Sequence, residues 1–175
     1  MRVSSIGPTL IQQERIHTRV KELGREIEDF YKGRPVLALA VLKGAFHFVS
    51  DLIRAIDGPV EVAFITLSSY GAGTESTGKV RQLSSLDTDI TDRDVLIVED
   101  IIDTGHTLTH LLKSLGPRNP ASLRTCTLLN KPSKRQVEVP IDHKGFDIPD
   151  VFVVGYGLDL AERYRNLPYI AEWVP

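Results

Sequence analysis

A continuous apolar run that ends in acidic residues constrains the fold of this chain more than any other feature. Residues 95–98 are all aliphatic and mostly β-branched, without the polar alternation of a half-exposed strand. Such a run is typical of a parallel strand that is buried on both faces. Glu99 and Asp100 follow directly, and residues 104–115 then have the pattern of a helix. A buried strand that leads into a helix predicts an α/β protein.

The same alternation of strand and helix covers most of the chain. Apolar residues spaced three and four apart predict a helix over residues 12–31, which ends near Gly33 and Pro35. Apolar runs between turn residues predict the other elements, namely strands over residues 36–42, 60–67 and 123–129, a return strand over 79–83 and a helix over 45–56. We therefore expect a mostly parallel central sheet flanked by helices.

The last part of the chain has a different texture. After Lys131, prolines at positions 132, 140 and 149 interrupt the sequence, and the apolar runs become short. The length of 175 residues fits one domain. We predict a single domain over residues 1–175, with a core over about 10–131 and a small hood and C-terminal subdomain over about 132–175.

Bulk properties narrow the class of protein. The net charge of −2 gives no general reason to bind nucleic acid or a membrane surface. No apolar stretch approaches the ~18 residues of a membrane-spanning helix. The N-terminus lacks the basic and apolar segments of a secretory signal, so we expect a cytoplasmic location. Cys126 is the only cysteine, and its apolar neighbours predict a buried hydrophobic residue.

The turn after the acidic pair has the properties of a phosphate site. Thr104, Gly105 and Thr107 open the predicted helix, where free backbone N–H groups and a partial positive charge favour an anion. The two acids would repel a phosphate, but they suit sugar hydroxyls or a divalent cation at the strand end where ligands bind. This segment can therefore bind a ribose 5-phosphate. The alternative is that the acids bind only Mg²⁺ or cap the helix.

Two more features belong to the same edge of the predicted sheet. Lys43 and Gly44 end a buried strand. In isolation Lys43 is a surface lysine with a packed stem; beside a phosphate site it is a candidate pyrophosphate ligand, and Gly44 allows close approach of the backbone. Residues 68–78, which include Ser69 and Tyr70, contain three glycines. They form either a flexible hairpin or a lid that excludes water from a reactive sugar cation.

The final third carries a candidate base pocket. Lys131 follows the last predicted strand of the core, and Phe152 begins an aromatic and aliphatic run that ends at Asp159. One interpretation is an edge strand with an acid at its end. In the other, Phe152 stacks on a heterocycle, Lys131 donates to an exocyclic oxygen and Asp159 binds a metal ion. Arg163 and Arg165 follow closely and are candidates for binding a diphosphate.

The order of these motifs resembles that of a known family. Two acids, two aliphatic residues and then Asp-Thr-Gly-x-Thr, at positions 99–107, are similar to the phosphoribosyl diphosphate (PRPP) signature of type I phosphoribosyltransferases. The segments 42–44, 69–71, 99–105, 131 and 152–159 occur in the order found in hypoxanthine-guanine phosphoribosyltransferases. The resemblance spans about residues 10–174. It implies a type I phosphoribosyltransferase fold and transfer of a 5-phosphoribosyl group from PRPP to a 6-oxopurine.

The resemblance also implies roles for single residues on the PRPP side. Glu99 and Asp100 would bind the ribose hydroxyls, and Asp103 would be the general acid/base at purine N7. The residues implied for the 5′-phosphate are Thr104, Gly105, His106 and Thr107. Those implied for the pyrophosphate are Lys43, Gly44 and Arg165. The Leu42–Lys43 peptide is implied to be cis.

On the base side, Lys131 would contact purine O6, Phe152 would stack on the ring and the Val153 backbone would read the base edge. Asp159 would lie beside the base and coordinate Mg²⁺, the implied cofactor. The full set of implied metal ligands is Asp159, Glu99 and Asp100. The family's partners are PRPP and a 6-oxopurine, without nucleic acid or membrane, and its members are homodimers or homotetramers.

Regulatory proteins of the same fold, which sense PRPP or nucleotides, are the alternative. A basic face or an added DNA-binding domain would favour them, whereas the net charge here is −2. Asp103 and Lys131 are the two residues implied to handle the base, and their presence favours an enzyme. A lysine donor fits a 6-oxo group and not the 6-amino group of adenine.

Overall fold

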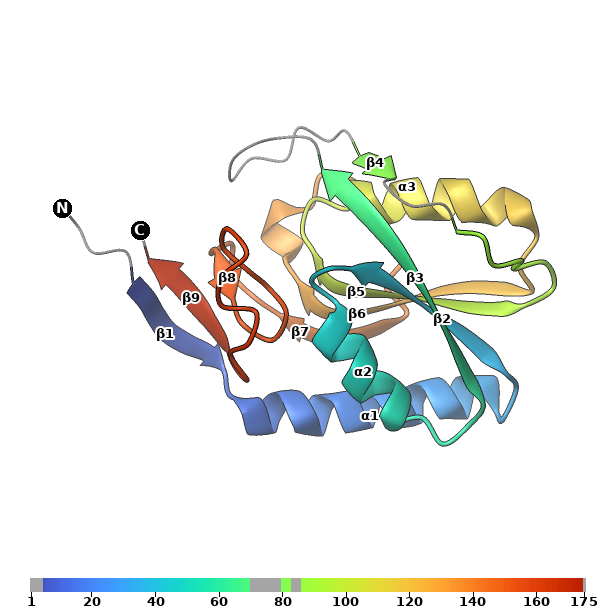
Figure 1. The fold of residues 1–175 in the computed structure, drawn as a ribbon, viewed down its shortest axis with the longest axis horizontal. Helices are drawn as coiled ribbons and strands as arrows, with labels where there is room; N and C mark the ends of the chain where they lie inside the picture. Colours follow the sequence, from blue (N-terminus) through green and yellow to red (C-terminus); the bar gives the residue numbers. More distant parts are fainter. Residues whose placement is uncertain (1–4, 70–79, 83–85, 175) are drawn as a thin grey trace.

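The fold places a six-stranded sheet between helices and a three-stranded sheet beside it (Figure 1). The computed structural model describes residues 5–69, 80–82 and 86–174. The large sheet contains β2 (Val36–Leu42), β3 (Val60–Ser69), β4 (Val80–Gln82), β5 (Asp94–Ile102), β6 (Ser122–Asn130) and β7 (His143–Asp147). The small sheet contains β1 (Ser5–Ile11), β8 (Val153–Val154) and β9 (Ile170–Val174). The helices are α1 (Gln13–Tyr31), α2 (Phe46–Arg54) and α3 (His106–Leu115), with 3₁₀ turns η1 (Gly116–Arg118) and η2 (Pro132–Lys134).

The strand order confirms the predicted fold class. The large sheet has the order β4-β3-β2-β5-β6-β7, and β4 alone within it runs antiparallel to its neighbour. The small sheet has the order β1-β9-β8 and is antiparallel throughout. A mostly parallel sheet therefore forms the centre of the molecule.

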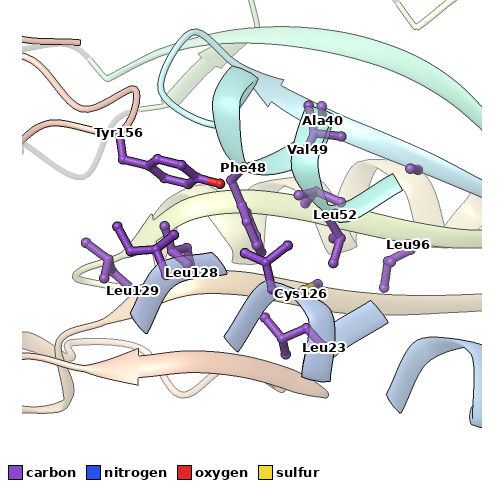
Figure 2. Close-up of a cluster of buried hydrophobic side chains, with 14 of the residues drawn as sticks. Leu23, Ala40, Phe48, Val49, Leu52, Leu96, Cys126, Leu128, Leu129 and Tyr156 are labelled. Atoms are coloured by element: carbon purple, nitrogen blue, oxygen red, sulfur yellow. The ribbon is translucent and has the colours of Figure 1, made fainter. Parts of the chain in front are cut away.

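Helices cover both faces of the large sheet, which explains the unalternating strands. Residues Ala38 and Ala40 of β2 pack in the cluster shared with α1 and α2, whereas Leu37 and Leu39 pack in the cluster shared with α3. Figure 2 shows the first cluster, in which Phe48 of α2 lies among side chains from α1, β5 and β6. Because both faces of β2 are covered in this way, every position of that strand is apolar.

Predicted and observed elements agree closely at α1 and β2. The predicted strand over residues 95–98 was too short, because β5 continues to Ile102 and stays paired with β6. Glu99 and Asp100 are therefore the last polar residues within the strand. The helix begins at His106, two residues later than expected, because Gly105 takes a left-handed φ of 92° before it.

The two sheets do not divide the chain at Lys131. Strand β7 lies beyond that residue, yet it joins the large sheet beside β6. Strand β1 comes from the start of the chain and pairs with β9 at its end (Figure 1). Among the described residues, no helix is long and apolar enough to cross a membrane.

Candidate functional site

Three parallel neighbours bring the predicted site residues to one edge of the sheet. Strands β2, β5 and β6 lie side by side in the same direction. Lys43 follows the end of β2, Asp100 lies near the end of β5, and Lys131 follows the end of β6. The carboxyl edge of such a sheet is the place where ligands bind in α/β folds.

Close backbone packing joins this edge to the C-terminal segment. The Leu42–Lys43 peptide is cis, as the resemblance implies. A Cβ atom on Gly44 would clash with the carboxylate of Asp100. One on Gly157 would clash with the carbonyl oxygen of Gly44, and Gly157 also has a left-handed φ of 102°. Position 157 therefore requires glycine, and a side chain at position 44 would displace the Asp100 carboxylate.

The predicted pyrophosphate ligands come together around an acid that the sequence did not single out. Nζ of Lys43 lies 3.0 Å from Oε1 of Glu162, and Nη2 of Arg165 lies 3.1 Å from Oε2 of the same side chain. Nη2 of Arg165 also lies 2.8 Å from Oδ1 of Asp159, and Nη1 donates to the Gly157 carbonyl at 2.7 Å. Hydrogen bonds from Lys43 and then Arg165 hold the pKa of Glu162 below its usual range.

The acidic pair of β5 lies beside this group. Glu99 is buried, and its Oε1 has no hydrogen-bond partner among the described residues. Burial, and then the neighbouring Asp100, raise the pKa of Glu99 well above its ordinary value. Burial raises the pKa of Asp100 to about 6, while Arg165 lowers it and Asp159 raises it. A cation or hydroxyl donors placed beside these acids would therefore stabilise their ionised forms.

The predicted phosphate turn is held by residues that follow β6. Backbone N–H groups of Gln136 and Val137 donate to the Thr104 carbonyl at 3.0 and 3.1 Å. Nε2 of His106 lies 3.0 Å from Oε1 of Gln136. Gly105 precedes α3 without a side-chain cap, and a Cβ atom there would clash with the Val137 carbonyl. Gly105 thus offers no side-chain acceptor to the first-turn amides of α3, and the His106 N–H donates to Oγ1 of Thr104 at 3.5 Å.

Asp103 lies between that turn and the predicted base side. Its Oδ2 is 3.7 Å from Nζ of Lys134, and its Oδ1 is buried without a hydrogen-bond partner among the described residues. Lys131 is buried, with Nζ 3.8 Å from Oδ1 of Asp150, and Lys134 reaches the same oxygen at 3.4 Å. Burial lowers the pKa of Lys131, and the charge of Asp103 opposes that effect.

The remaining base-side residues lie at the edge of the small sheet. Phe152 is 37 % exposed, so its ring is accessible to a stacking partner, and its carbonyl accepts from Trp173 N–H at 2.8 Å. Val153 is buried and pairs with Glu172 of β9. Through Asp150, the segment that leads into Phe152 is tied to Lys131.

The predicted lid is only partly covered by the described residues, and the predicted metal ligands are few. Ser69 ends β3 opposite Val80, whereas Tyr70 and the rest of the predicted lid lie outside the described residues. Among the described residues, no group of three or more acidic, histidine or cysteine side chains is arranged to hold a metal ion. Mg²⁺ often takes only one or two carboxylates and completes its shell with water and substrate oxygens. The mutually repelling Asp100 and Asp159 fit that smaller donor set.

Comparison with known proteins assigns the family. Residues 10–161 match the family described as the phosphoribosyl transferase domain. The chain belongs to this family. It is 51% identical over 167 residues to a hypoxanthine phosphoribosyltransferase of Salmonella typhimurium, covering 94% of each chain. It is 53% identical to a hypoxanthine-guanine phosphoribosyltransferase of Mycobacterium avium, covering 97% of this chain and 87% of the relative.

Solved structures place it in the same branch of the phosphoribosyltransferases. A crystal structure of a hypoxanthine-guanine phosphoribosyltransferase from Bacillus anthracis superposes with a TM-score of 0.92 at 49% identity, covering 97% of this chain and all of that one. The type I phosphoribosyltransferase fold expected from the motifs is therefore confirmed.

Three residues of the site were missed from the sequence. Lys134 ends η2, whose N-cap residue is Lys131, and Pro132 was the available signal for that turn. Asp150 and Glu162 reach the site from distant segments, Glu162 being 119 residues away from Lys43. No local pattern predicts the contact between Glu162 and Lys43, although Glu162 lies only three residues from Arg165.

Proposed function

We propose that this protein transfers the 5-phosphoribosyl group of PRPP to a 6-oxopurine, hypoxanthine or guanine, and releases pyrophosphate. Xanthine is a further possible base, since a 6-oxo group is the shared feature that Lys131 would recognise. The product is a purine nucleoside monophosphate, so the reaction belongs to purine salvage. The names of the relatives and the order of the site residues support this function.

The observation that carries the proposal is the position of Asp103. It lies between the strand that bears Glu99 and Asp100 and the first turn of α3, and it faces the lysines that follow β6. A ribose 5-phosphate bound by the strand end and the turn would therefore present its anomeric carbon near the base side. That geometry suits transfer between a sugar phosphate and a heterocycle.

The chemical difficulty is charge separation. As the bond to pyrophosphate breaks, the anomeric carbon becomes cationic and the leaving group gains negative charge. Lys43 and Arg165 would stabilise the leaving group. Glu99, whose Oε1 has no partner in the described part of the chain, and Asp100 would accept hydrogen bonds from the ribose hydroxyls and place negative charge near the sugar cation.

Asp103 would manage the proton of the purine. As a ring nitrogen forms the bond to the anomeric carbon, the base becomes acidic at N7, and the Asp103 carboxylate takes that proton. Lys131 would donate to O6 and Phe152 would stack on the ring, so that the base is oriented while Asp103 acts. The partly exposed position of Phe152 supports this role.

Mg²⁺ is part of the proposal. When bound, it would supply charge neutralisation at the pyrophosphate oxygens. Asp159 is the first candidate ligand, and Glu99 and Asp100 are the others, because their oxygens are the hard donors that Mg²⁺ prefers. Removing Mg²⁺ with a chelator should abolish turnover, and adding it back should restore turnover.

The test of the function is pyrophosphate release from PRPP with hypoxanthine, guanine or xanthine as acceptor. Release that depends on one of these bases and on Mg²⁺ would support the proposal. Tight binding of PRPP without release under any of these conditions would contradict it and favour the regulatory alternative.

We also propose a homodimer or homotetramer that acts in the cytoplasm. Val62 and Phe64 of β3 are 37 % and 53 % exposed, and residues two apart in a strand lie on the same face. Burying that apolar face against a second copy would support association. A cytoplasmic location fits substrates whose phosphate charges make membrane crossing costly. Light scattering would establish the oligomeric state; a monomer at working concentration would contradict it.

A further inference from the structure

The carboxylate of Glu162 bridges the two cations that are candidates for pyrophosphate binding. Oε1 lies 3.0 Å from Nζ of Lys43, and Oε2 lies 3.1 Å from Nη2 of Arg165. Two oxygens of one anionic group thus contact two separate cations. A phosphate group of pyrophosphate presents oxygens in the same way, so the two anions would compete for the same contacts.

The backbone around Glu162 is held in a conformation that side chains rarely adopt. Leu160 and Arg163 exchange both backbone hydrogen bonds, at 3.2 and 3.0 Å, and enclose a two-residue turn. The two turn residues, Ala161 and Glu162, have φ values of 49° and 64°. Turns of this kind favour asparagine and glycine, so an alanine and a glutamate are unfavourable choices locally. Such strain at a strand turn points to a role for the side chain it displays.

Arg165 does not depend on Glu162 for its position. Arg165 is 19 % exposed, and it is anchored by the Gly157 carbonyl at 2.7 Å and by Oδ1 of Asp159 at 2.8 Å. Glu162 and Lys43 are each 64 % exposed, so their side chains can separate into solvent. The Glu162 carboxylate can therefore leave while Arg165 stays in place.

We propose that the Glu162 carboxylate is an internal substitute for pyrophosphate. The carboxylate contacts Lys43 and Arg165 in the free protein and returns to them when pyrophosphate leaves. This rests on the proposed function. Pyrophosphate must displace the carboxylate before it binds. The apparent affinity for pyrophosphate is therefore the intrinsic affinity multiplied by the fraction of molecules in which the Glu162 contact is open. After transfer, the returning carboxylate competes with the product and favours its release. Glu162 thus sets affinity and release rate without contacting the reacting atoms.

The test is direct binding of pyrophosphate to the full chain. Calorimetry with sodium pyrophosphate in excess MgCl₂ compares the wild type, Glu162→Gln and the control Glu22→Gln. Glu22 is also a half-exposed acid paired with an arginine, Arg19 at 2.8 Å, but it lies on α1. Because an exposed ion pair changes an equilibrium constant only modestly, we expect Glu162→Gln to bind pyrophosphate about threefold to tenfold more tightly than the wild type. The control should bind as the wild type does.

Kinetics supply the second readout. The Glu162→Gln variant should have a lower KM for PRPP and stronger product inhibition by pyrophosphate, with an unchanged KM for the purine. Unfolding temperatures of the three proteins would confirm that each is folded.

The outcomes separate the two proposals. Equal or weaker binding of pyrophosphate by Glu162→Gln, in a protein whose wild type binds it and turns over, would overturn the role of Glu162 and leave the function intact. A wild type that binds no pyrophosphate and releases none from PRPP would overturn the proposed function itself, and this inference with it.

Discussion

Asp103 is the residue whose surroundings most directly indicate a chemical role. One of its oxygens lies near the Lys134 ammonium, and the other is buried without a partner among the described residues. Its nearest proposed ligand is the base, whereas the phosphate turn and the β5 acids would contact the sugar phosphate. Loss of its charge should therefore affect proton transfer more than PRPP binding.

The substitution Asp103→Asn tests this separation. We expect kcat to fall by about 10²-fold to 10⁴-fold, because a general base typically contributes that much, while the Kd of PRPP changes only a few-fold. Asp29→Asn, an exposed acid on α1, is the matched control and should change neither quantity. Equal losses in kcat and PRPP affinity would remove Asp103 from the acid/base role.

Gly44 offers a second test at the scale of one atom. A Cβ atom there would clash with the carboxylate of Asp100, so Gly44→Ala should displace the acid that is proposed to hold the ribose. We expect PRPP affinity to fall about tenfold or more, since a displaced charged contact typically costs that much. Gly116→Ala is the control, because no neighbouring atom of the described residues lies within 4 Å of the added methyl group. Binding that survives Gly44→Ala unchanged would show that Asp100 has no part in it.

At the scale of elements, the sequence predicts buried strands better than it predicts their ends. Strand β2 matched its predicted bounds, because its apolar run stops sharply at Lys43. Strand β5 was underestimated, because Glu99 and Asp100 are polar and yet remain within the strand. Glu99 is buried and Asp100 is partly buried near the carboxyl end of β5. These two acids were thus the reason the strand seemed to end early.

The 3₁₀ turn η2 gives the prediction that belongs to this scale. The buried Lys131 immediately precedes it, and Lys134, which lies nearer to Asp103, ends it. We expect Lys131→Met to raise the KM of the purine about tenfold to hundredfold, because a charged hydrogen bond to O6 is lost. The Kd of PRPP should stay the same, measured without the base.

A matched lysine makes that comparison specific. Lys113→Met removes an exposed charge from α3 and should leave both constants at the wild-type values. A Lys131→Met variant whose PRPP affinity falls as much as its purine affinity would place Lys131 elsewhere than in the base pocket.

For the whole molecule, local sequence patterns predicted the helix and sheet layers but not the contacts between segments that are distant in the sequence. The strand and helix alternation indicated the large sheet, whereas β1 reaches β9 across almost the full chain, pairing Ile6 with Trp173. The contact of Lys43 with Glu162 likewise joins distant segments. Motifs that lie within one strand and turn were recognisable, and contacts that depend on the position of the hood were not.

One long-range contact gives a prediction for the stability of the whole fold. His143 of β7 is buried, with Nδ1 3.7 Å from Oε2 of Glu26 on α1, and so it lies where the last strand of the large sheet meets a helix. Its Nε2 is also buried and has no hydrogen-bond partner among the described residues. Burial lowers the pKa of His143 from its ordinary 6.5, and the nearby Glu26 only partly offsets this.

Because the folded pKa of His143 is the lower one, acid should destabilise the fold through this residue. As pH falls below about 6.5, the unfolded chain binds a proton at His143, whereas the folded chain does not yet bind one. The free energy of unfolding therefore decreases. We expect the wild type to lose more stability between about pH 7.5 and pH 5.5 than His143→Gln does, measured by urea unfolding. His17→Gln, at an exposed position, should follow the wild type. If the wild type instead gained stability relative to His143→Gln as pH falls from about 7.5 to 5.5, the attraction of Glu26 would outweigh burial, and His143 would be charged in the folded protein.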